Sequence, residues 1–465
     1  ERMSAGRFFD RNKNLAMIPA IFALAWPTML EQLLQTAVQY IDTAMVGSLG
    51  THATASVGAT GTLNWLVTGT ISAMGIGFLA RISQSLGAGD VQQARKISAQ
   101  SVLTALICGI VFTAAALGLA PQITQWMQID PSIEPEARMY FMILSSCLLF
   151  RSACMIFGTV LRAAGDTKTP MKVGLFMNGI NVLFNVLLIY PSTTLHLFGS
   201  TITIPQAGWQ TAGAAAASAI AFCAGGVLMT WKLYRHPDVS FRHESIKPDW
   251  SILKPCFRIS YPNVLQRFGT FLGFVVFATL INTLGPVAVA AHTVANTVES
   301  AFYIPGWGMQ AAAATLAGNA WGARDEEQLH TLRQSILPLE TALMTLSGLL
   351  LFLGAPSLVA VFSRDPEVNQ LGTAVLRMVA VTEPIYGIPI VLEGIMMGMG
   401  NTKLPFVFNI TTMWGIRIVG TWICIRLLHL GLISAWACMI AHNFALFVLF
   451  VSCHFVQTKK RTRAA

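Results

Sequence analysis

The sequence predicts an all-α polytopic membrane protein with twelve transmembrane helices in two parallel-repeat six-helix lobes around a central cavity. Three observations lead to this fold class: an apolar composition, apolar stretches of membrane-spanning length along the whole chain, and an internal repeat. Of the 465 residues, 54% are hydrophobic and only 11% are charged, whereas roughly 25% are charged in ordinary globular proteins. Such a chain is suited to a bilayer.

Apolar stretches of the ~20 residues needed to cross a bilayer recur between short polar connections. They are too long for the strands of a transmembrane barrel, so helices are the remaining spanning structure. The predicted helices are 18–46, 58–80, 97–119, 137–161, 170–191, 209–231, 256–283, 286–316, 332–354, 370–398, 405–428 and 431–456.

The net charge of +9 reflects membrane topology, because 23 of the 30 Lys and Arg residues fall on one side of the predicted helices. The positive-inside rule places that side, with both termini, in the cytoplasm. Residues 1–16 are too charged for a secretory leader, so the first helix serves as the insertion signal. We expect a multi-pass protein of the plasma membrane, in a bacterium the inner membrane, with no nucleic-acid partner.

An internal repeat relates the two halves of the chain at one constant offset in numbering. The offset carries Pro27 onto Pro262, Leu49-Gly50 onto Leu284-Gly285, and the stretch "GDTKTP" (165–170) onto "GNTKLP" (400–405). A repeat that contains six helices enters the membrane twice in the same orientation. The halves are therefore parallel repeats, and two such lobes that rock about a shared cavity are typical of transporters.

The repeat divides the chain into parts. The polar stretch with Pro237 and Pro248 is the natural linker between the lobes. The predicted parts are a cytoplasmic N-terminal segment (1–17), an N-lobe (18–233), a cytoplasmic linker (234–255), a C-lobe (256–456) and a basic cytoplasmic tail (457–465). In the repeated Gly-Asp/Asn-Thr-Lys-x-Pro loops, glycine ends one helix and proline begins the next. These loops either serve only as tight connections between helices or also take part in gating.

Ionisable residues at membrane depth are functional candidates, because inserting each costs about 3 kcal/mol unless it is paired or hydrated. Glu31 and Asp42 lie eleven residues apart in the first helix, which returns to within about 20° of one direction. Gln35 and Gln39 follow the same stripe. We expect this polar stripe to line the substrate cavity and Pro27 to act as a hinge in the helix.

Three asparagines, Asn178, Asn181 and Asn185, share one face of the predicted helix 170–191. One buried Asn commonly holds helices together, whereas three on one face near an unpaired aspartate favour a site, and we expect Asn178 at the substrate cavity. In the helix 209–231, small residues permit close packing and Ser218 supplies a hydroxyl group.

The second lobe does not repeat Asp42, since the repeat offset carries that position onto Phe277. The charged residues of this lobe could form salt bridges with one another or line the cavity, and both interpretations stay open. We expect Arg267, Glu383 and Glu393 at the cavity. The full set is Arg267, Glu299, Glu340, Arg377, Glu383, Glu393, Arg417 and His442.

Motifs of catalysis do not occur in the sequence. The eight cysteines form no C-x-x-C pair and are expected to be reduced. Neither a phosphate-binding G-x-x-x-x-G-K-[ST] loop nor H-E-x-x-H is found. We therefore expect a transporter and not an enzyme, without a cofactor other than its coupling ion and without a bound metal, unless Na⁺ binds at Asp42.

These features together resemble the multidrug and toxic compound extrusion (MATE) family of secondary transporters. The family exports cationic or amphipathic compounds in exchange for inward H⁺ or Na⁺. The resemblance covers nearly the whole chain and rests on Pro27, "VQYIDTAMVGSLG" (38–50), "SQSLGAGD" (83–90), "RAAGDTKTP" (162–170), "GPVAVAAHTVANTVES" (285–300) and "EGIMMGMGNTKLP" (393–405).

The resemblance implies that Asp42 is the protonation or sodium site of the first lobe. Asn181, Asn185 and Ser218 match its partners in family members of the archaeal type. The position of Asn185 is often Asp in those relatives, so this site holds at most one negative charge. The other branch of the family has an acid in the first helix of the second lobe, and no acid lies near Gly269.

The expected activity is proton-coupled antiport, in which Asp42 exchanges a proton for a cationic or amphipathic substrate within a monomer in the bilayer. Oxygen atoms of Asp, Asn and Ser also suit Na⁺, so the choice of ion stays open. A flippase for a lipid-linked saccharide or another amphiphilic lipid is the alternative, because Arg151, Arg267, Arg377 and Arg417 suit anionic groups.

Overall fold

A computed structural model of the chain describes residues 17–126, 129–197 and 200–462, and these residues are almost entirely helical. The first sixteen residues and the last three, parts of the predicted terminal segments, lie outside the described ranges. The elements of the first half are α1 (Met17–Gly47), α2 (Thr51–Gly87), α3 (Val91–Trp126), α4 (Glu134–Ser146), α5 (Leu148–Ala163), α6 (Lys168–Ile189), β1 (Pro191–Leu197), β2 (Ser200–Ala207) and α7 (Gln210–Tyr234).

The second half contains more and shorter helices than the first. Its elements are α8 (Trp250–Asn282), α9 (Pro286–Phe302), α10 (Ile304–Gly322), α11 (Glu326–Phe362), α12 (Pro366–Ala380), α13 (Glu383–Gly398), α14 (Lys403–Thr412), the π-helix η2 (Met413–Ile418), α15 (Val419–Trp422), the π-helix η3 (Ile423–Leu427) and α16 (Leu432–Thr462).

Membrane-spanning helices are confirmed, although several of the twelve predicted spans are broken. In the described part of the chain, eight helices are long and apolar enough to cross a bilayer, and the bent pairs α4–α5 and α12–α13 raise the number to ten. The predicted helices 286–316 and 405–428 are present as shorter pieces. The break before α10 and the break before α13 each precede a proline, Pro305 and Pro384, which cannot continue the backbone hydrogen bonds of a preceding turn.

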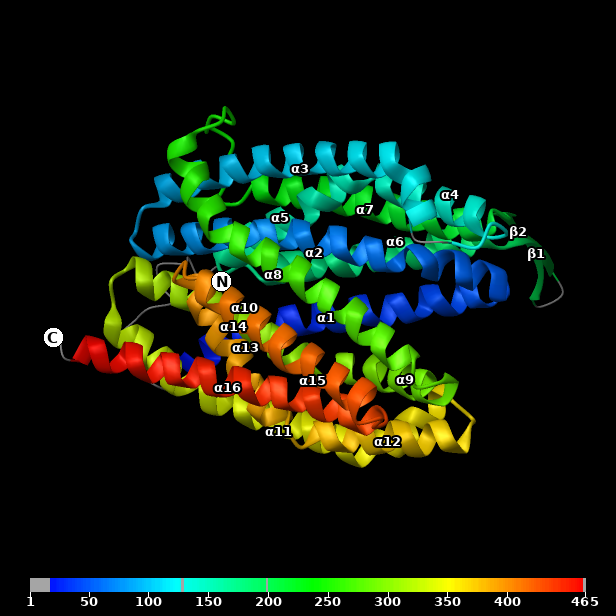
Figure 1. Cartoon of the computed structure of the whole chain (residues 1–465). Helices are drawn as coiled ribbons and strands as arrows, with labels where there is room; N and C mark the ends of the chain where they lie inside the picture. The colour runs from blue at the N-terminus through cyan, green and yellow to red at the C-terminus, as the bar shows by residue number, and fades with distance from the viewer. Residues whose placement is uncertain (1–16, 127–128, 198–199, 463–465) are drawn as a thin grey trace. The chain divides into compact units, whose positions relative to one another are not determined.

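One element was not expected from the sequence. Strands β1 and β2 pair antiparallel, with Leu197 opposite Ser200, and the hairpin continues beyond the ends of α6 and α7 (Figure 1). The predicted helices 170–191 and 209–231 leave this connection without an assigned element. The all-α class stands for the membrane-spanning part.

The chain forms two compact units. Unit 1 comprises residues 1–29, 79–90 and 256–465, and unit 2 comprises residues 30–78 and 91–255. Most of the predicted N-lobe, with the linker, thus lies in unit 2, while the start of α1 and the end of α2 belong to unit 1. The boundary within α1 comes two residues after Pro27, the predicted hinge.

The repeat is visible in the backbone of the turns. Positive φ angles occur at Gly50 and Gly285 and at Gly165 and Gly400, and the repeat offset relates the two members of each pair. In the "GDTKTP" and "GNTKLP" turns, Gly165 N donates to Arg162 O and Gly400 N to Met397 O, both over 2.9 Å. These glycines close a helix in the left-handed conformation that the sequence motif predicts.

In unit 1, the ends of α2 and α10 cross with their backbones in close contact. A Cβ atom on Gly87 would lie 2.0 Å from Asn319 O, and one on Gly322 would lie 1.9 Å from Gln84 O. Gln84 also donates from Nε2 to Gly398 O over 2.9 Å. The repeat offset relates Gln84 to Asn319 and Gly87 to Gly322, so equivalent positions of the repeat make the contact reciprocally.

Candidate functional site

The structure brings Asp42, Asn185, Asn181 and Ser218 into one chain of hydrogen bonds within unit 2. Asn185 donates from Nδ2 to Asp42 Oδ1 over 2.5 Å and to Asn181 Oδ1 over 3.1 Å. Asn181 in turn donates to Ser218 Oγ over 3.0 Å. All four predicted ion-coupling residues therefore contact one another in series.

Three helices position these side chains. Asp42 is on α1, the two asparagines occupy successive turns of α6, and Ser218 lies on α7. Helices α6 and α7 approach closely because α7 is rich in small residues: a Cβ atom on Gly213 would lie 2.5 Å from Leu188 O. Close backbone approach of this kind is what small residues permit in membrane helices.

The surroundings of this site are polar but contain little charge. Asn185 is fully buried and Asn181 nearly so, whereas Asp42 is partly exposed. In the described residues, Asp42 forms no salt bridge, and the Asn185 Oδ1 atom has no hydrogen-bond partner. A carboxylate with free lone pairs beside an unused amide oxygen can take up a proton or contribute oxygen ligands to a small hard cation.

Asn178 lies one turn before Asn181 but is not part of the hydrogen-bond chain. Its Nδ2 atom is buried without a partner among the described residues. A buried amide group without a partner costs free energy, so a substrate group or a water molecule is expected beside it.

The residues of the predicted polar stripe on α1 do not form one connected network. Glu31 accepts a hydrogen bond from Arg162 Nη1 over 3.1 Å, and both side chains are at most 20% exposed. Gln35 contacts Glu31 at 3.5 Å, and no hydrogen bond joins the Gln39 side chain to Asp42 in the described structure. Glu31 is thus neutralised by an arginine that the sequence analysis did not pair with it, because the partners lie 131 residues apart.

The second-lobe candidates lie in unit 1, and two of them are near each other. Glu393 accepts a hydrogen bond from Gln266 Nε2 over 2.8 Å, and the exposed Arg267 interacts with it electrostatically. Glu383 is 1% exposed, and neither of its carboxylate oxygens has a hydrogen-bond partner among the described residues.

Glu340, for which the sequence left a salt bridge or a cavity role open, is a second buried acid without a hydrogen-bond partner in the described residues. It is fully buried, and both of its carboxylate oxygens lack hydrogen bonds in the described part of the chain. Its Oε1 atom packs against α13, where a Cβ atom on Gly387 would lie 2.9 Å away. Gly387 is one turn after Glu383, so the two acids face the same stretch of unit 1. Nothing in the sequence indicates that Glu340 lacks a partner.

Replacing Glu340 or Glu383 by Gln is expected to leave the melting temperature unchanged or to raise it. A buried carboxyl group without a partner costs free energy, either through its charge or through the proton it must take up to lose that charge. Gln has nearly the same shape and avoids both costs. Thermal unfolding of the purified protein measures the effect. Glu31→Gln is the contrast, because it removes a paired carboxylate and is expected to lower the melting temperature. A clear drop for Glu340→Gln would reveal a stabilising partner.

The position equivalent to Asp42 in the second lobe has different chemistry. Phe277 is 1% exposed, and the Arg417 guanidinium carbon lies 4.2 Å from the centre of its ring. A second ring, that of Phe274, lies 5.0 Å from the same carbon. An arginine over aromatic faces is a stable arrangement of its own, so the two lobes share a fold but not a binding site.

A further polar cluster surrounds Glu136 in unit 2. Its carboxylate accepts hydrogen bonds from Ser56 over 3.1 Å and from Thr211 over 2.5 Å, and His52 Nδ1 lies 3.2 Å away. These residues come from α2, α4 and α7. Sequence reasoning missed the cluster because the separations of 75 to 84 residues carry no pattern.

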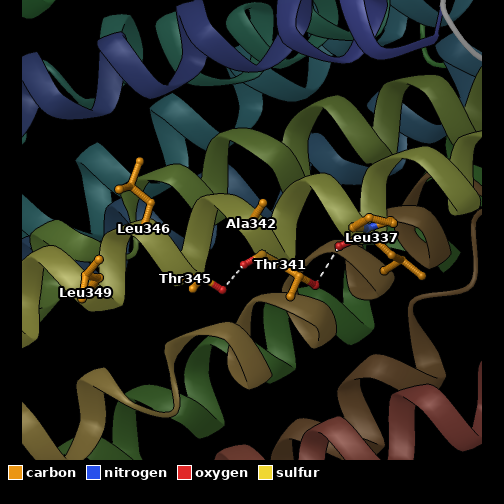
Figure 2. Close-up of a pocket in the computed structure, with 7 residues that line it drawn as sticks. Leu337, Thr341, Ala342, Thr345, Leu346 and Leu349 are labelled. Atoms are coloured by element: carbon orange, nitrogen blue, oxygen red, sulfur yellow. Dashed lines mark hydrogen bonds between the residues drawn. The ribbon is translucent and has the colours of Figure 1, made fainter.

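A shallow groove on α11 has no connection with these polar sites. Figure 2 shows Leu337, Ala342, Leu346 and Leu349 along this helix, with the Thr341 hydroxyl donating to Leu337 O over 2.8 Å. The lining is mostly apolar and comes from one helix. Its composition suits contact with lipid tails and offers no group that would orient a polar substrate.

Comparison with known proteins identifies one family. The family model MatE matches residues 27–187 and again residues 262–423. The two matches begin at Pro27 and Pro262, the pair of prolines that the internal repeat makes equivalent.

Curated relatives and solved structures agree with this match. The chain is 27% identical over 422 residues to the probable multidrug resistance protein NorM of Thermotoga maritima, covering 90% of this chain and 88% of the relative. It is 23% identical to the multidrug resistance protein MdtK of Yersinia pseudotuberculosis, covering 85% of each.

Two solved structures share the fold at 20% sequence identity. The first is a MOP superfamily transporter from Pyrococcus furiosus, with a TM-score of 0.87 and 98% of each chain covered. The second is the outward-facing conformation of a multidrug resistance MATE family transporter, with a TM-score of 0.86 and 99% of each chain covered. The predicted architecture of two six-helix lobes fits these neighbours.

Proposed function

The chain belongs to the MatE family of multidrug transporters, and on this premise we propose that it exports cationic or amphipathic small molecules by antiport with an inward-moving cation, H⁺ in preference to Na⁺. The observation that carries the proposal is the contact between Asp42 and Asn185, with no basic partner for Asp42 in the described structure. The single carboxylate of this site is thereby free to exchange one cation for another.

Two states of Asp42 supply the coupling. When ionised, Asp42 attracts a cationic substrate into the first-lobe cavity. When a proton binds, the attraction is lost and the substrate leaves toward the outside, because binding of the two cations to one carboxylate is mutually exclusive. Neutralising the carboxylate also lowers the cost of closing the hydrated cavity.

Asn185, Asn181 and Ser218 act on Asp42 as positioning residues in this proposal. Asn185 holds the carboxylate through its amide group, and its second bond, to Asn181, fixes the orientation of that amide. Because Asn185 does not titrate, each transport cycle moves one proton through this site. The proline at position 27, beside the boundary between the units, supports a bend of α1 during the cycle.

Transport of a cationic dye by reconstituted protein tests the proposal. Proteoliposomes receive either a pH gradient or a Na⁺ gradient, each imposed separately. We expect the pH gradient to drive dye movement and the Na⁺ gradient to have a small effect. Dye movement that follows the Na⁺ gradient alone would reverse the choice of ion, and movement that follows neither would refute antiport.

Asn185→Asp is expected to increase the response to Na⁺ in the same assay. A second carboxylate beside Asp42 would raise the negative charge of the site, and hard cations favour sites with more charged oxygen ligands. Asn401→Asp serves as the control, since it adds a carboxylate in a turn of unit 1, at the position that the repeat offset relates to Asp166. An unchanged Na⁺ response in Asn185→Asp would show that charge at this position does not set the ion choice.

A flippase is the alternative, and it would need arginines that are free to hold an anionic group. In the structure, Arg151 donates to Asn64 over 2.9 Å in unit 2, whereas Arg377 contacts Phe352 O at 3.4 Å and Arg417 lies over Phe277 in unit 1. These arginines have separate local partners, and multidrug export remains our proposal.

A further inference from the structure

A basic cavity lies at the ends of two candidate membrane spans. There the linker after α7 packs beside the start of α3 (Figure 1). Its volume is about 690 Å³, within the range of small-molecule sites. The proposed transport mechanism does not use it. Its lining residues, all in unit 2, are Gln92, Arg95, Tyr234, Arg235, His236, Pro237, Ser240, Arg242, His243 and Glu244.

The linker is held in a defined shape by side chains of α3. Arg95 donates from Nη2 to Pro237 O over 2.6 Å, and Gln92 donates to Glu244 over 2.8 Å. Further along, Gln100 donates to Lys247 O over 2.8 Å and accepts from Asp249 N over 3.1 Å. The cavity is therefore a built feature and not a gap beside a loose chain.

The end of the linker is equally well ordered. The hydroxyl and backbone N–H groups of Ser251 both donate to Asp249 Oδ1, and these hydrogen bonds hold the pKa of Asp249 below its usual range. Asp249 stays ionised at the start of α8, where a negative charge is favourable. It does not line the cavity.

Three guanidinium groups face the cavity and none is neutralised by a carboxylate in the described residues. Arg235 lies over the Trp231 ring at 4.6 Å and Arg242 over the Tyr234 ring at 5.8 Å. Arg95 contacts only a backbone carbonyl, and its Nε atom is buried without a partner. The one acidic residue of the lining, Glu244, is held by Gln92.

Two helix ends beside the cavity show how deep it lies. The first turn of α3 adds to the positive potential through its positive dipole end, whereas the C-terminal end of α7 at Tyr234 has the opposite sign and lowers it. Both helices are candidate membrane spans, and Trp and Tyr at the end of a span are typical of the membrane interface. The cavity thus lies at the level of lipid headgroups.

We propose that this cavity, formed by Arg95, Arg235 and Arg242, binds the phosphodiester headgroup of an anionic phospholipid. Paired N–H groups of arginine match phosphate oxygens geometrically, and basic pockets at the cytoplasmic face of membrane proteins take anionic headgroups. A free phosphate shares this chemistry, but the aromatic rings below Arg235 and Arg242 favour a ligand with an apolar part in the bilayer. The proposal does not depend on which ion drives transport.

Lipid titration of the full-length protein in detergent tests the proposal without a transport assay. Phosphatidylglycerol, phosphatidylcholine and inorganic phosphate are added separately, and native mass spectrometry counts bound lipid while thermal unfolding reports stabilisation. We expect phosphatidylglycerol to bind and to raise the melting temperature, and the other two to have little effect. Equal stabilisation by inorganic phosphate would overturn the assignment to a lipid.

A matched pair of double variants separates the cavity from general surface charge. Arg235→Gln with Arg242→Gln is expected to weaken binding of phosphatidylglycerol about tenfold or more. Lys247→Gln with Lys254→Gln removes the same charge from the same linker outside the cavity and is expected to retain wild-type binding. Equal loss in both double variants, or loss in neither, would overturn the proposal.

Discussion

Replacing Asp42 by Asn is expected to reduce proton-driven dye export to the level of protein-free liposomes. Asn keeps the shape of the side chain and can still contact Asn185, but it neither carries a charge nor takes up a proton. Because Asn181, Asn185 and Ser218 do not titrate in the physiological range, no neighbour in the hydrogen-bond chain can replace the carboxylate. The measurement is dye flux under an imposed pH gradient.

Dye binding to Asp42→Asn distinguishes loss of coupling from loss of folding. The variant is expected to be purified with a normal melting temperature, because its position is partly exposed and its charge has no salt-bridge partner in the described residues. Asp238→Asn is the control, since it removes a carboxylate from the linker and is expected to transport normally. Continued proton-driven export by Asp42→Asn would refute the central role of this residue.

Substituting Gly322 by Ala is expected to destabilise unit 1 by about 3 kcal/mol, the upper part of the range for overpacking. The new Cβ atom would lie 1.9 Å from Gln84 O, and a backbone atom in a helix cannot move aside as the end of a side chain can. Gly87→Ala is expected to have a similar effect through Asn319 O, 2.0 Å away. Thermal unfolding of the purified variants measures the loss.

Gly118→Ala is the matched control for this experiment. Gly118 lies within α3, and a Cβ atom placed on it would meet no atom within 4 Å beyond its neighbours in the same helix. Alanine favours a helix over glycine by about 1 kcal/mol, so this variant is expected to be as stable as the wild type or more so. If Gly322→Ala melts like Gly118→Ala, the close crossing of α2 and α10 is not required for stability.

The sequence predicted the helical class and the repeat because both depend on local patterns. Apolar runs of spanning length require helices in a bilayer. Gly165 and Gly400, which the repeat offset relates, both have positive φ angles in the structure. The breaks before Pro305 and Pro384 also follow from residue type, whereas the apolar runs alone predict one continuous helix in each segment.

Part of the candidate site was also predictable from periodicity. Asn181 and Asn185 share a helical face because they are four residues apart, and Asp42 is an acid within an apolar helix. The family resemblance then grouped these residues with Ser218. Their hydrogen bonds agree with that grouping, while their role in transport remains the proposal that the dye assay tests.

Long-range partnership was decided only by the tertiary structure. Arg162 pairs with Glu31 across 131 residues of sequence, Glu340 and Glu383 are buried without partners in the described chain, and the linker closes a basic cavity against α3. The physical reason is that periodicity specifies which face of a helix a residue occupies, but not which helix meets that face. Composition and repeat therefore determined the architecture, whereas the pairing of charges required the packed helices.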